Sequence, residues 1–166
     1  MLFRSKLAVI HNGIIENYAE LRKELEARGH KFSSETDTES VTHLLSDLRK
    51  KHNGDLAAAM RDCVNQLRGS FTLLAVHADQ PDLIVGVRRN SPLVAGIGSG
   101  ENFLASDVSA FMDLTKRAVE LGQNEIISIK PDSILITDLA GKQLPRSEEH
   151  TSELQSQSTI SYAVFC

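Results

Sequence analysis

The run Phe71-Thr72-Leu73-Leu74-Ala75-Val76-His77 constrains the fold most, because it is apolar at nearly every position. A strand with one face in water alternates apolar and polar residues, whereas a continuous apolar run is typical of a strand covered on both faces. We therefore predict that residues 71–77 lie in a sheet sandwiched between two other layers.

The residues before this run favour helices. Apolar residues recur there at helical spacing in three stretches, which predicts three amphipathic helices: Tyr18, Leu21 and Leu25; Val41, Leu44, Leu45 and Leu48; Leu56, Met60, Cys63, Val64 and Leu67. Gly29, Gly54 and Gly69 are placed to end them. Thr36 and Glu39 fit a capping box at the start of the second helix.

Strands dominate the rest of the chain. Residues 7–10 form a short apolar run that predicts a buried strand, broken by Asn12-Gly13. Later apolar runs bounded by Gly, Pro, Asn or Asp predict further strands at 83–87, 93–97, 103–105, 118–121, 125–129 and 133–137, with a short helix at 109–114 and a turn at 138–142. Because helices cluster early and strands late, the predicted fold class is α+β.

Composition excludes several classes of protein. The chain has 166 residues, enough for one domain, and a net charge of −4 without a basic cluster, which argues against nucleic-acid binding. No apolar run reaches the roughly 18 residues that span a bilayer, and the first residues lack the apolar stretch of a signal peptide. Cys63 and Cys166 give neither a disulfide framework nor a metal-binding pattern. We expect a cytoplasmic protein with no metal or other cofactor and no membrane partner.

Both ends of the chain differ from its middle. Residues 146–156 and 160–166 resemble the translation of a sequencing-library adapter, and residues 2–5 resemble the opposite adapter. The alternative is a natural disordered tail. We predict an adapter-derived head at 1–5, one partial domain at 6–145 and an adapter-derived, disordered tail at 146–166.

Five motifs appear in a fixed order within residues 6–145. They are His11 to Tyr18, Ser34 to Glu39, Gln66 to Phe71, Ser91 to Val94 and Gly100 to Asp107. In this order they resemble the glutaminase domain, a class II glutamine amidotransferase domain, of the glutamine–fructose-6-phosphate aminotransferase (isomerizing) family. Almost all of residues 6–145 takes part in the resemblance.

The resemblance implies an amino-terminal-nucleophile hydrolase fold, a four-layer αββα sandwich of which this chain holds a part. It also implies an enzyme of hexosamine biosynthesis that uses glutamine to make glucosamine 6-phosphate from fructose 6-phosphate. The implied partners are glutamine as substrate, a carboxy-terminal sugar isomerase domain and a second copy in a homodimer.

Asn12 and Gly13 match the family's oxyanion positions. Glutamine's amide is a poor electrophile, so its hydrolysis needs stabilisation of a tetrahedral oxyanion. The Asn12 side-chain amide and the Gly13 backbone N–H are suitable donors, and a glycine lets the oxygen come close. Without the surrounding motifs, Asn-Gly is more commonly a tight turn.

Asp37 matches the family position that binds the α-ammonium group of glutamine, for which a carboxylate is suited. Asp37 as a plain helix cap is the alternative, and one residue could serve both roles. Cys63 fits a buried core residue. His11, His43 and His77 have no ligand spacing and fit structural roles. Arg68 fits a helix-end cap.

Three family features are absent from the sequence: the amino-terminal nucleophilic cysteine, the Arg-x-Ala-Thr-His-Gly segment that grips the glutamine carboxylate, and the sugar-binding isomerase domain. We therefore expect the chain as written to be inactive. Two alternatives remain open, which are the glutaminase domain of another class II amidotransferase and a non-catalytic module that binds glutamine. Upstream DNA that encodes the cysteine and the missing segment would favour the enzyme.

Overall fold

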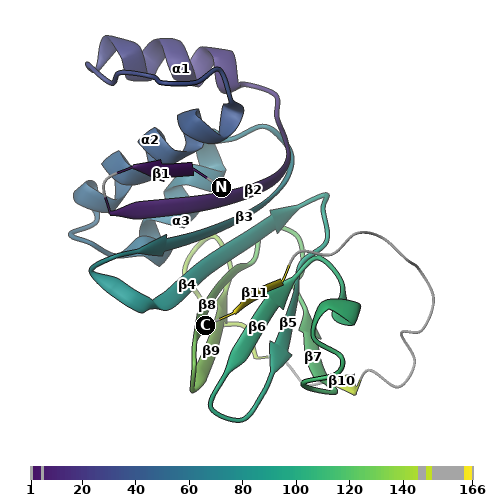
Figure 1. The fold of residues 1–166 in the computed structure, drawn as a ribbon. Helices are drawn as coiled ribbons and strands as arrows, with labels where there is room; N and C mark the ends of the chain where they lie inside the picture. Colours follow the sequence, from purple (N-terminus) through teal and green to yellow (C-terminus); the bar gives the residue numbers. More distant parts are fainter. Residues whose placement is uncertain (1, 5, 146–148, 151–162, 166) are drawn as a thin grey trace.

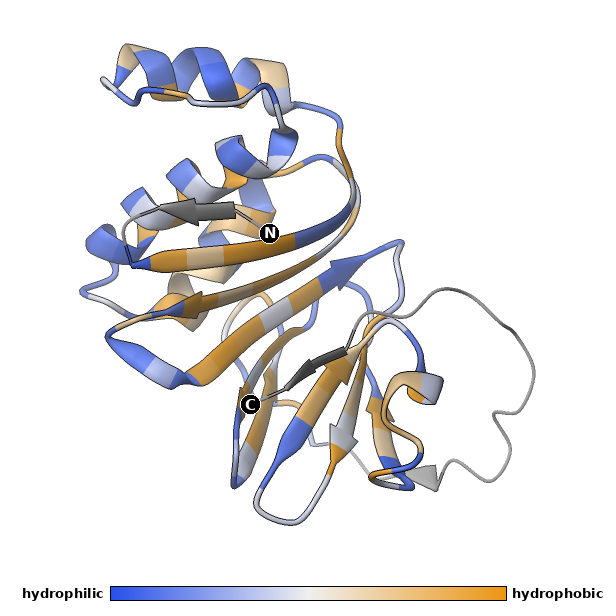
Figure 2. Cartoon of the chain, viewed as in Figure 1, coloured by the Kyte–Doolittle hydropathy of each residue, from blue (hydrophilic) through white to orange (hydrophobic). Residues whose placement is uncertain are grey.

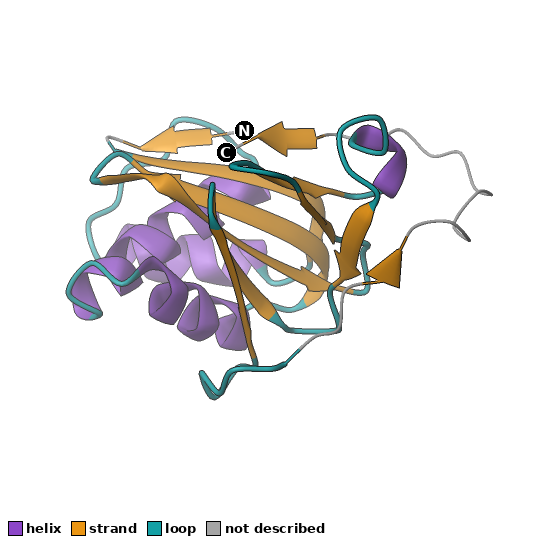
Figure 3. Ribbon diagram, turned by 90° about the horizontal axis from the view of Figure 1, so that it is seen from below, coloured by secondary structure: helices purple, strands orange, loops and turns teal. Residues whose placement is uncertain are grey.

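The computed structural model describes residues 2–4, 6–145, 149–150 and 163–165, and three layers can be followed in it (Figures 1 and 3). Helices α1 (Tyr18–Ala27), α2 (Asp37–Lys51) and α3 (Leu56–Gln66) form one layer. They cover one face of a six-stranded sheet whose other face packs on a five-stranded sheet. The predicted α+β class is confirmed.

The six-stranded sheet is antiparallel at every junction and has the order β1-β2-β3-β4-β8-β9. Its strands are β1 (Leu2–Arg4), β2 (Leu7–Ile15), β3 (Gly69–His77), β4 (Gln80–Arg89), β8 (Ile126–Lys130) and β9 (Ser133–Thr137). The five-stranded sheet has the order β10-β7-β5-β6-β11. Its strands are β5 (Val94–Ile97), β6 (Asn102–Ala105), β7 (Arg117–Glu120), β10 (Glu149–His150) and β11 (Ala163–Phe165).

Strand β3 is buried on both faces, as its apolar run predicts (Figure 2). Phe71, Leu73 and Ala75 belong to the core beneath the helices. Leu74 belongs to the core between the two sheets, and Val76 packs against it. Because side chains alternate across a strand, one apolar run supplies both cores.

The outer face of the five-stranded sheet is covered differently from the helix-covered sheet. Within the described residues it carries the 3₁₀ helix η1 (Val108–Ala110) in place of the helix predicted at 109–114. Phe111 follows η1 and stacks on Phe103, with ring centroids 5.9 Å apart. A Cβ on Gly96 would lie 2.7 Å from the Phe111 ring, so glycine makes room for it. This buried anchor turns the chain inward after one short turn of helix.

Several predicted boundaries need correction. Strand β2 continues through Asn12 and Gly13 to Ile15 and is not broken there. Helix α3 ends at Gln66, and Gly69 opens β3. The carbonyls at the end of α3 are capped by Arg89, which donates to Leu67 O and Val64 O, whereas Arg68 pairs with Glu20. The turn at 138–142 is confirmed.

The chain ends are described only in part. β1 lies beside the first half of β2, β10 beside β7 and β11 beside β6. Residues 149–150 and 163–165 are therefore extended, and the disordered tail predicted for 146–166 falls otherwise on residues that the structure does not describe. Residues 1, 5, 146–148, 151–162 and 166 lie outside the described residues, and the adapter origin of the ends stays a prediction. No helix among the described residues combines the length and apolarity that crossing a membrane requires.

Candidate functional site

The second half of β2 presents an open backbone edge. Two hydrogen bonds frame the β2–β3 ladder, Ala78 N to Lys6 O at 2.8 Å and Glu16 N to Arg68 O at 2.8 Å. Between them the register is unbroken, so even-numbered residues of β2 face β3 and odd-numbered residues direct their N–H groups to the opposite edge. On that edge β1 pairs no further than Val9. The Gly13 N–H therefore points away from β3, toward an edge with no strand partner in the described part of the chain.

Asp37, the first residue of α2, reaches the same edge. Its Oδ2 accepts the Ile15 N–H at 3.1 Å. Its Oδ1 accepts the Thr38 hydroxyl at 3.4 Å and lies 3.3 Å from His11 Nδ1. The Asp37 side chain remains 24% exposed, so a ligand at the edge can reach the carboxylate. The structure thus brings Asp37 and the Gly13 N–H to one edge, with the Ile15 contact two residues from Gly13 along β2.

Asn12 occupies the neighbouring position with its side chain on a face of the sheet. It shares this face with Ile10, which packs toward the core between the sheets, because side chains two apart lie on one face. Asn12 is exposed, and so is Ile14, at 67%. The alternative of a tight turn at Asn12-Gly13 is wrong, since both residues lie within β2.

The backbone conformation at position 13 also requires a glycine, apart from any role in binding. Its φ is +119°, and a Cβ there would lie 2.2 Å from Ser70 O in β3. Gly69 mirrors it from β3, because its φ is +124° and a Cβ there would lie 2.2 Å from Ile14 O. The two strands cross so closely that side chains are excluded at both points. The glycine at 13 therefore has a structural cause that is independent of any substrate.

The Glu39 carboxylate holds the loop before α2, and this role differs from the capping box predicted for it. The predicted capping box is not formed, because neither Thr36 nor Glu39 makes its reciprocal bond. Glu39 Oε1 accepts from Ser33 N at 2.7 Å and Oγ at 2.9 Å, and Oε2 accepts from Ser34 N and Oγ at 2.6 Å each. Burial alone would raise the pKa of Glu39, but these bonds from Ser34 and Ser33 outweigh it and lower the pKa to about 2.

Two histidines extend this anchor. His43 Nε2 lies 3.5 Å from Glu39 Oε1, His43 Nδ1 lies 3.0 Å from His30 Nδ1, and His30 Nε2 lies 2.6 Å from Asp47 Oδ2. This series of polar contacts connects the loop between α1 and α2 to residues within α2. The start of α2, and with it Asp37, is fixed as a result.

Cys63 is excluded as a nucleophile. Its side chain is buried in the core beneath the helices, and burial raises its pKa to about 12. A thiol reacts as its thiolate, so this cysteine is unreactive at neutral pH. Cys166 lies outside the described residues. Among the residues that are described, no group of three His, Cys, Asp or Glu side chains is placed to hold a metal ion.

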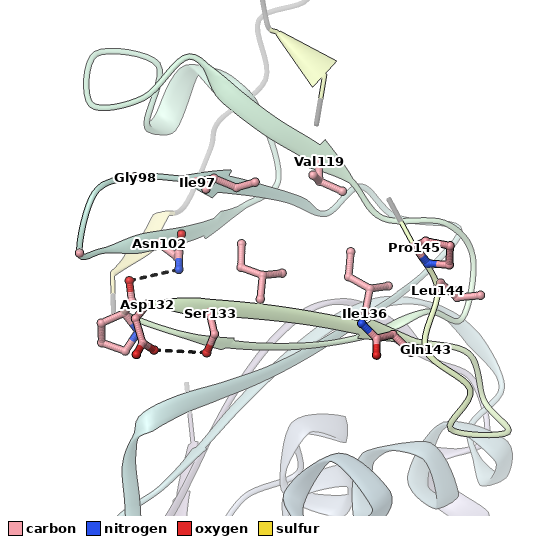
Figure 4. A pocket seen from close by; sticks show the side chains of 13 residues that line it. Ile97, Gly98, Asn102, Val119, Asp132, Ser133, Ile136, Gln143, Leu144 and Pro145 are labelled. Carbon is pink, nitrogen blue, oxygen red and sulfur yellow. Dashed lines mark hydrogen bonds between the residues drawn. The ribbon is translucent and has the colours of Figure 1, made fainter. Parts of the chain in front are cut away.

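A separate hollow of about 580 Å³ lies between the two sheets (Figure 4). Its walls are polar and apolar in about equal measure, and the apolar side chains include Ile97 and Val119 on one side and Ile136 and Leu144 on the other. Asn102 Nδ2 donates to Lys130 O and Pro131 O at its end. None of its lining residues belongs to β2 or α2, so it is distinct from the edge that carries Gly13 and Asp37.

The sequence predicts site roles for Asn12, Gly13 and Asp37, but it does not predict the residues that contact Asp37 and hold the loop before α2. His11 was assigned a structural role, and Thr38 and Ser33 were assigned none. The alternation along β2 offered one signal, because it places His11 on the same face as Val9 and Ile15. Contacts with Thr38 depend on how α2 docks on β2, which spacing does not reveal.

Sequence comparisons with known proteins point to one family. The model of the family described as "Glutamine amidotransferase domain" matches residues 1–113. The glutamine–fructose-6-phosphate aminotransferase [isomerizing] of Corynebacterium glutamicum is 55% identical over 139 residues, which is 83% of this chain and 22% of the relative. That of Thermus thermophilus is 45% identical over 141 residues, 85% of this chain and 23% of the relative. The chain thus spans about a fifth of the length of these relatives.

Solved structures show the same fold. The glutamine phosphoribosylpyrophosphate amidotransferase from B. subtilis, complexed with ADP and GMP, aligns with a TM-score of 0.70 at 24% identity and covers 86% of this chain and 32% of its own. A glutamine aminotransferase class-II domain protein from Silicibacter pomeroyi aligns with a TM-score of 0.54 at 15% identity, over 80% of this chain and 66% of its own. These structures support the amino-terminal-nucleophile hydrolase type of fold.

Proposed function

The chain belongs to the glutamine amidotransferase domain family, and from this premise we propose that the open edge of β2 binds and polarises the side-chain amide of glutamine. In this proposal the Gly13 N–H and the Asn12 side-chain amide donate to the oxyanion that forms when the amide carbon is attacked. Asp37 binds the α-ammonium group of the same glutamine by a charge-assisted hydrogen bond.

One observation carries this proposal: the Gly13 N–H and the Asp37 carboxylate meet the same edge of β2. The Ile15 N–H points to the same edge as the Gly13 N–H and already donates to Asp37 Oδ2. An extended amino acid that lies along the edge could therefore place its ammonium near Asp37 and its amide near Gly13. The family's own glutamine chemistry supports the choice of amino acid.

We further propose that the whole protein passes nitrogen from glutamine to fructose 6-phosphate and so makes glucosamine 6-phosphate. The glutamine–fructose-6-phosphate aminotransferase of Corynebacterium glutamicum is 55% identical to the chain over the matched residues. Under the same proposal the protein acts in the cytoplasm, has a sugar isomerase domain and forms a homodimer. The alternative of another class II amidotransferase rests on the 24% identity to a phosphoribosylpyrophosphate enzyme, which reflects the shared fold alone.

The 166-residue chain itself should release no ammonia from glutamine. Cys63 is buried with a raised pKa, and the sequence near Asn12 contains no other cysteine. The roles of Asn12 and Asp37 are therefore tested in a full-length protein that carries these residues, by measuring glutamate release and glucosamine 6-phosphate formation.

Asn12→Ala should lower kcat for glutamine hydrolysis by about 100- to 1,000-fold with little change in KM, because an oxyanion donor acts in the transition state. Asp37→Asn should raise KM instead, because the Ile15 contact can be kept while the charge is lost. Glu35→Gln is the matched control, since Glu35 is an exposed carboxylate two residues away. Unchanged kcat in Asn12→Ala together with unchanged KM in Asp37→Asn would refute the proposal.

A further inference from the structure

The His11 imidazole lies between β2 and the start of α2, and the proposed function gives it no part in binding glutamine. Its side chain is only 4% exposed. Nδ1 lies 3.1 Å from Thr38 Oγ1 and 3.3 Å from Asp37 Oδ1. Nε2 is buried and has no hydrogen-bond partner among the described residues. One ring nitrogen is therefore engaged with the Asp37 carboxylate and its neighbour, and the other is not engaged.

These contacts favour one tautomer. With the proton on Nδ1, the ring donates to Thr38 Oγ1, and the Thr38 hydroxyl is left to donate to Asp37 Oδ1 at 3.4 Å. With the proton on Nε2, the buried N–H has no acceptor, and a bare Nδ1 faces the carboxylate. A buried donor without an acceptor is the rarer and costlier arrangement. Burial also lowers the pKa of His11, although Asp37 opposes this shift, and a lowered pKa favours the neutral ring.

We propose that neutral His11, protonated on Nδ1, is a positioning residue for glutamine: its N–H holds the Thr38 hydroxyl, which in turn holds Asp37 Oδ1. The Ile15 N–H holds the other carboxylate oxygen. Both oxygens of Asp37 are thus fixed before any ligand arrives, and the ordering cost on binding is reduced. This inference rests on the proposed role of Asp37 and names the residues that orient it.

The tautomer can be tested in the 166-residue chain without any assumption about function. Long-range ¹H–¹⁵N NMR spectra distinguish protonated from bare ring nitrogens, and the spectrum of His11→Asn assigns the His11 signals. We expect a protonated Nδ1 and a bare Nε2 at pH 7.5. A proton on Nε2, or on both nitrogens, would overturn the proposal.

The positioning role is tested by glutamine kinetics in the full-length protein. His11→Leu and Thr38→Val should each raise KM for glutamine about tenfold, the size expected for one hydrogen bond to a charged group, with kcat changed less. His11→Asn and Thr38→Ser retain a donor and a hydroxyl, so both should restore most of the loss. His77→Asn is the matched control, because His77 is a buried histidine on the neighbouring strand that bonds Asp79 N instead.

A substrate analogue without the α-ammonium group separates positioning from a general structural effect. Its KM should be the same in wild type and His11→Leu, because it does not use Asp37. In Asp37→Asn, the further change His11→Leu should add little to KM. If Asp37→Asn raises KM and His11→Leu does not, this inference fails while the proposed function stands. If Asp37→Asn leaves KM unchanged, the proposed role of Asp37 fails, and this inference fails with it.

Discussion

Gly13 shows how one residue can satisfy the family pattern for more than one reason. The resemblance assigns it to the oxyanion site, and its N–H does point to the open edge of β2. Yet its φ of +119° and the approach of Ser70 O require glycine whether or not a substrate binds. Substitution at 13 therefore reports on folding, and Asn12 is the better probe of chemistry.

Gly13→Ala should destabilise the chain by more than about 4 kcal/mol, because the new Cβ overlaps a backbone oxygen that has little room to move. Gly100→Ala is the matched control. Its φ is also positive, at +76°, but nothing lies within 4 Å of the Cβ position, so it should cost only about 1–2 kcal/mol. Urea unfolding followed by circular dichroism measures both. Equal losses in the two variants would contradict the role assigned to the β2–β3 crossing.

At the residue scale, the motifs predicted site roles for Asn12, Gly13 and Asp37, and these roles stay predictions. The structure shows that Asp37 and the Gly13 N–H reach the same edge of β2. The need for glycine at 13 was attributed to substrate access, whereas the structure adds the close approach of β3. Spacing along one strand cannot show the backbone of its neighbour, so this cause could not be predicted.

At the scale of elements, local periodicity predicted the buried faces of the helices correctly, whereas the predicted contacts at the helix ends were wrong. The helical stripes of α2 and α3 are buried as predicted. The Thr36–Glu39 capping box was wrong, because Glu39 reaches back to Ser33 and Ser34. The arginine that caps α3 comes from β4, as Arg89, and not from the adjacent Arg68. Such contacts depend on how elements dock, which local sequence does not encode in a readable form.

Glu39 gives the start of α2 a pH dependence with a definite sign. Its pKa falls from 4.5 to about 2 in the folded chain, so the unfolded chain binds the proton more readily. The resulting stabilisation is fully present above about pH 4.5 and is lost as the pH falls toward 2. By linkage it amounts to about 3 kcal/mol at most.

Glu39→Gln should therefore lower the free energy of unfolding at pH 6, and the gap to wild type should narrow steadily between pH 4.5 and 2. Urea unfolding across this range measures the gap. Glu35→Gln serves as the control, because Glu35 lies in the same loop but is exposed. A gap between Glu39→Gln and wild type that stays constant with pH would show that the carboxylate charge is not what holds the loop.

At the scale of the whole molecule, the two cores share one sheet. Leu73 and Leu74 are adjacent in β3 but enter different cores, the first beneath the helices and the second between the sheets. The apolar run at 71–77 predicted this double burial, and the order of elements predicted the α+β class. The four-layer sandwich came from the family resemblance, because periodicity alone does not count layers. The described residues form three of those four layers, and η1 lies on the outer face of the third.

Since β3 lies in both cores, we expect the folded part of the chain to unfold as one cooperative unit. Leu73→Ala and Leu74→Ala should each cost about 2–5 kcal/mol, the usual range for a buried leucine. Each should lower a single transition seen by both far-UV circular dichroism and calorimetry. The pair is internally matched, because the two changes delete the same atoms on opposite faces of one strand. A second, lower transition in Leu74→Ala, with the helical signal still intact, would mean that the five-stranded sheet melts independently and that β3 does not couple the two cores.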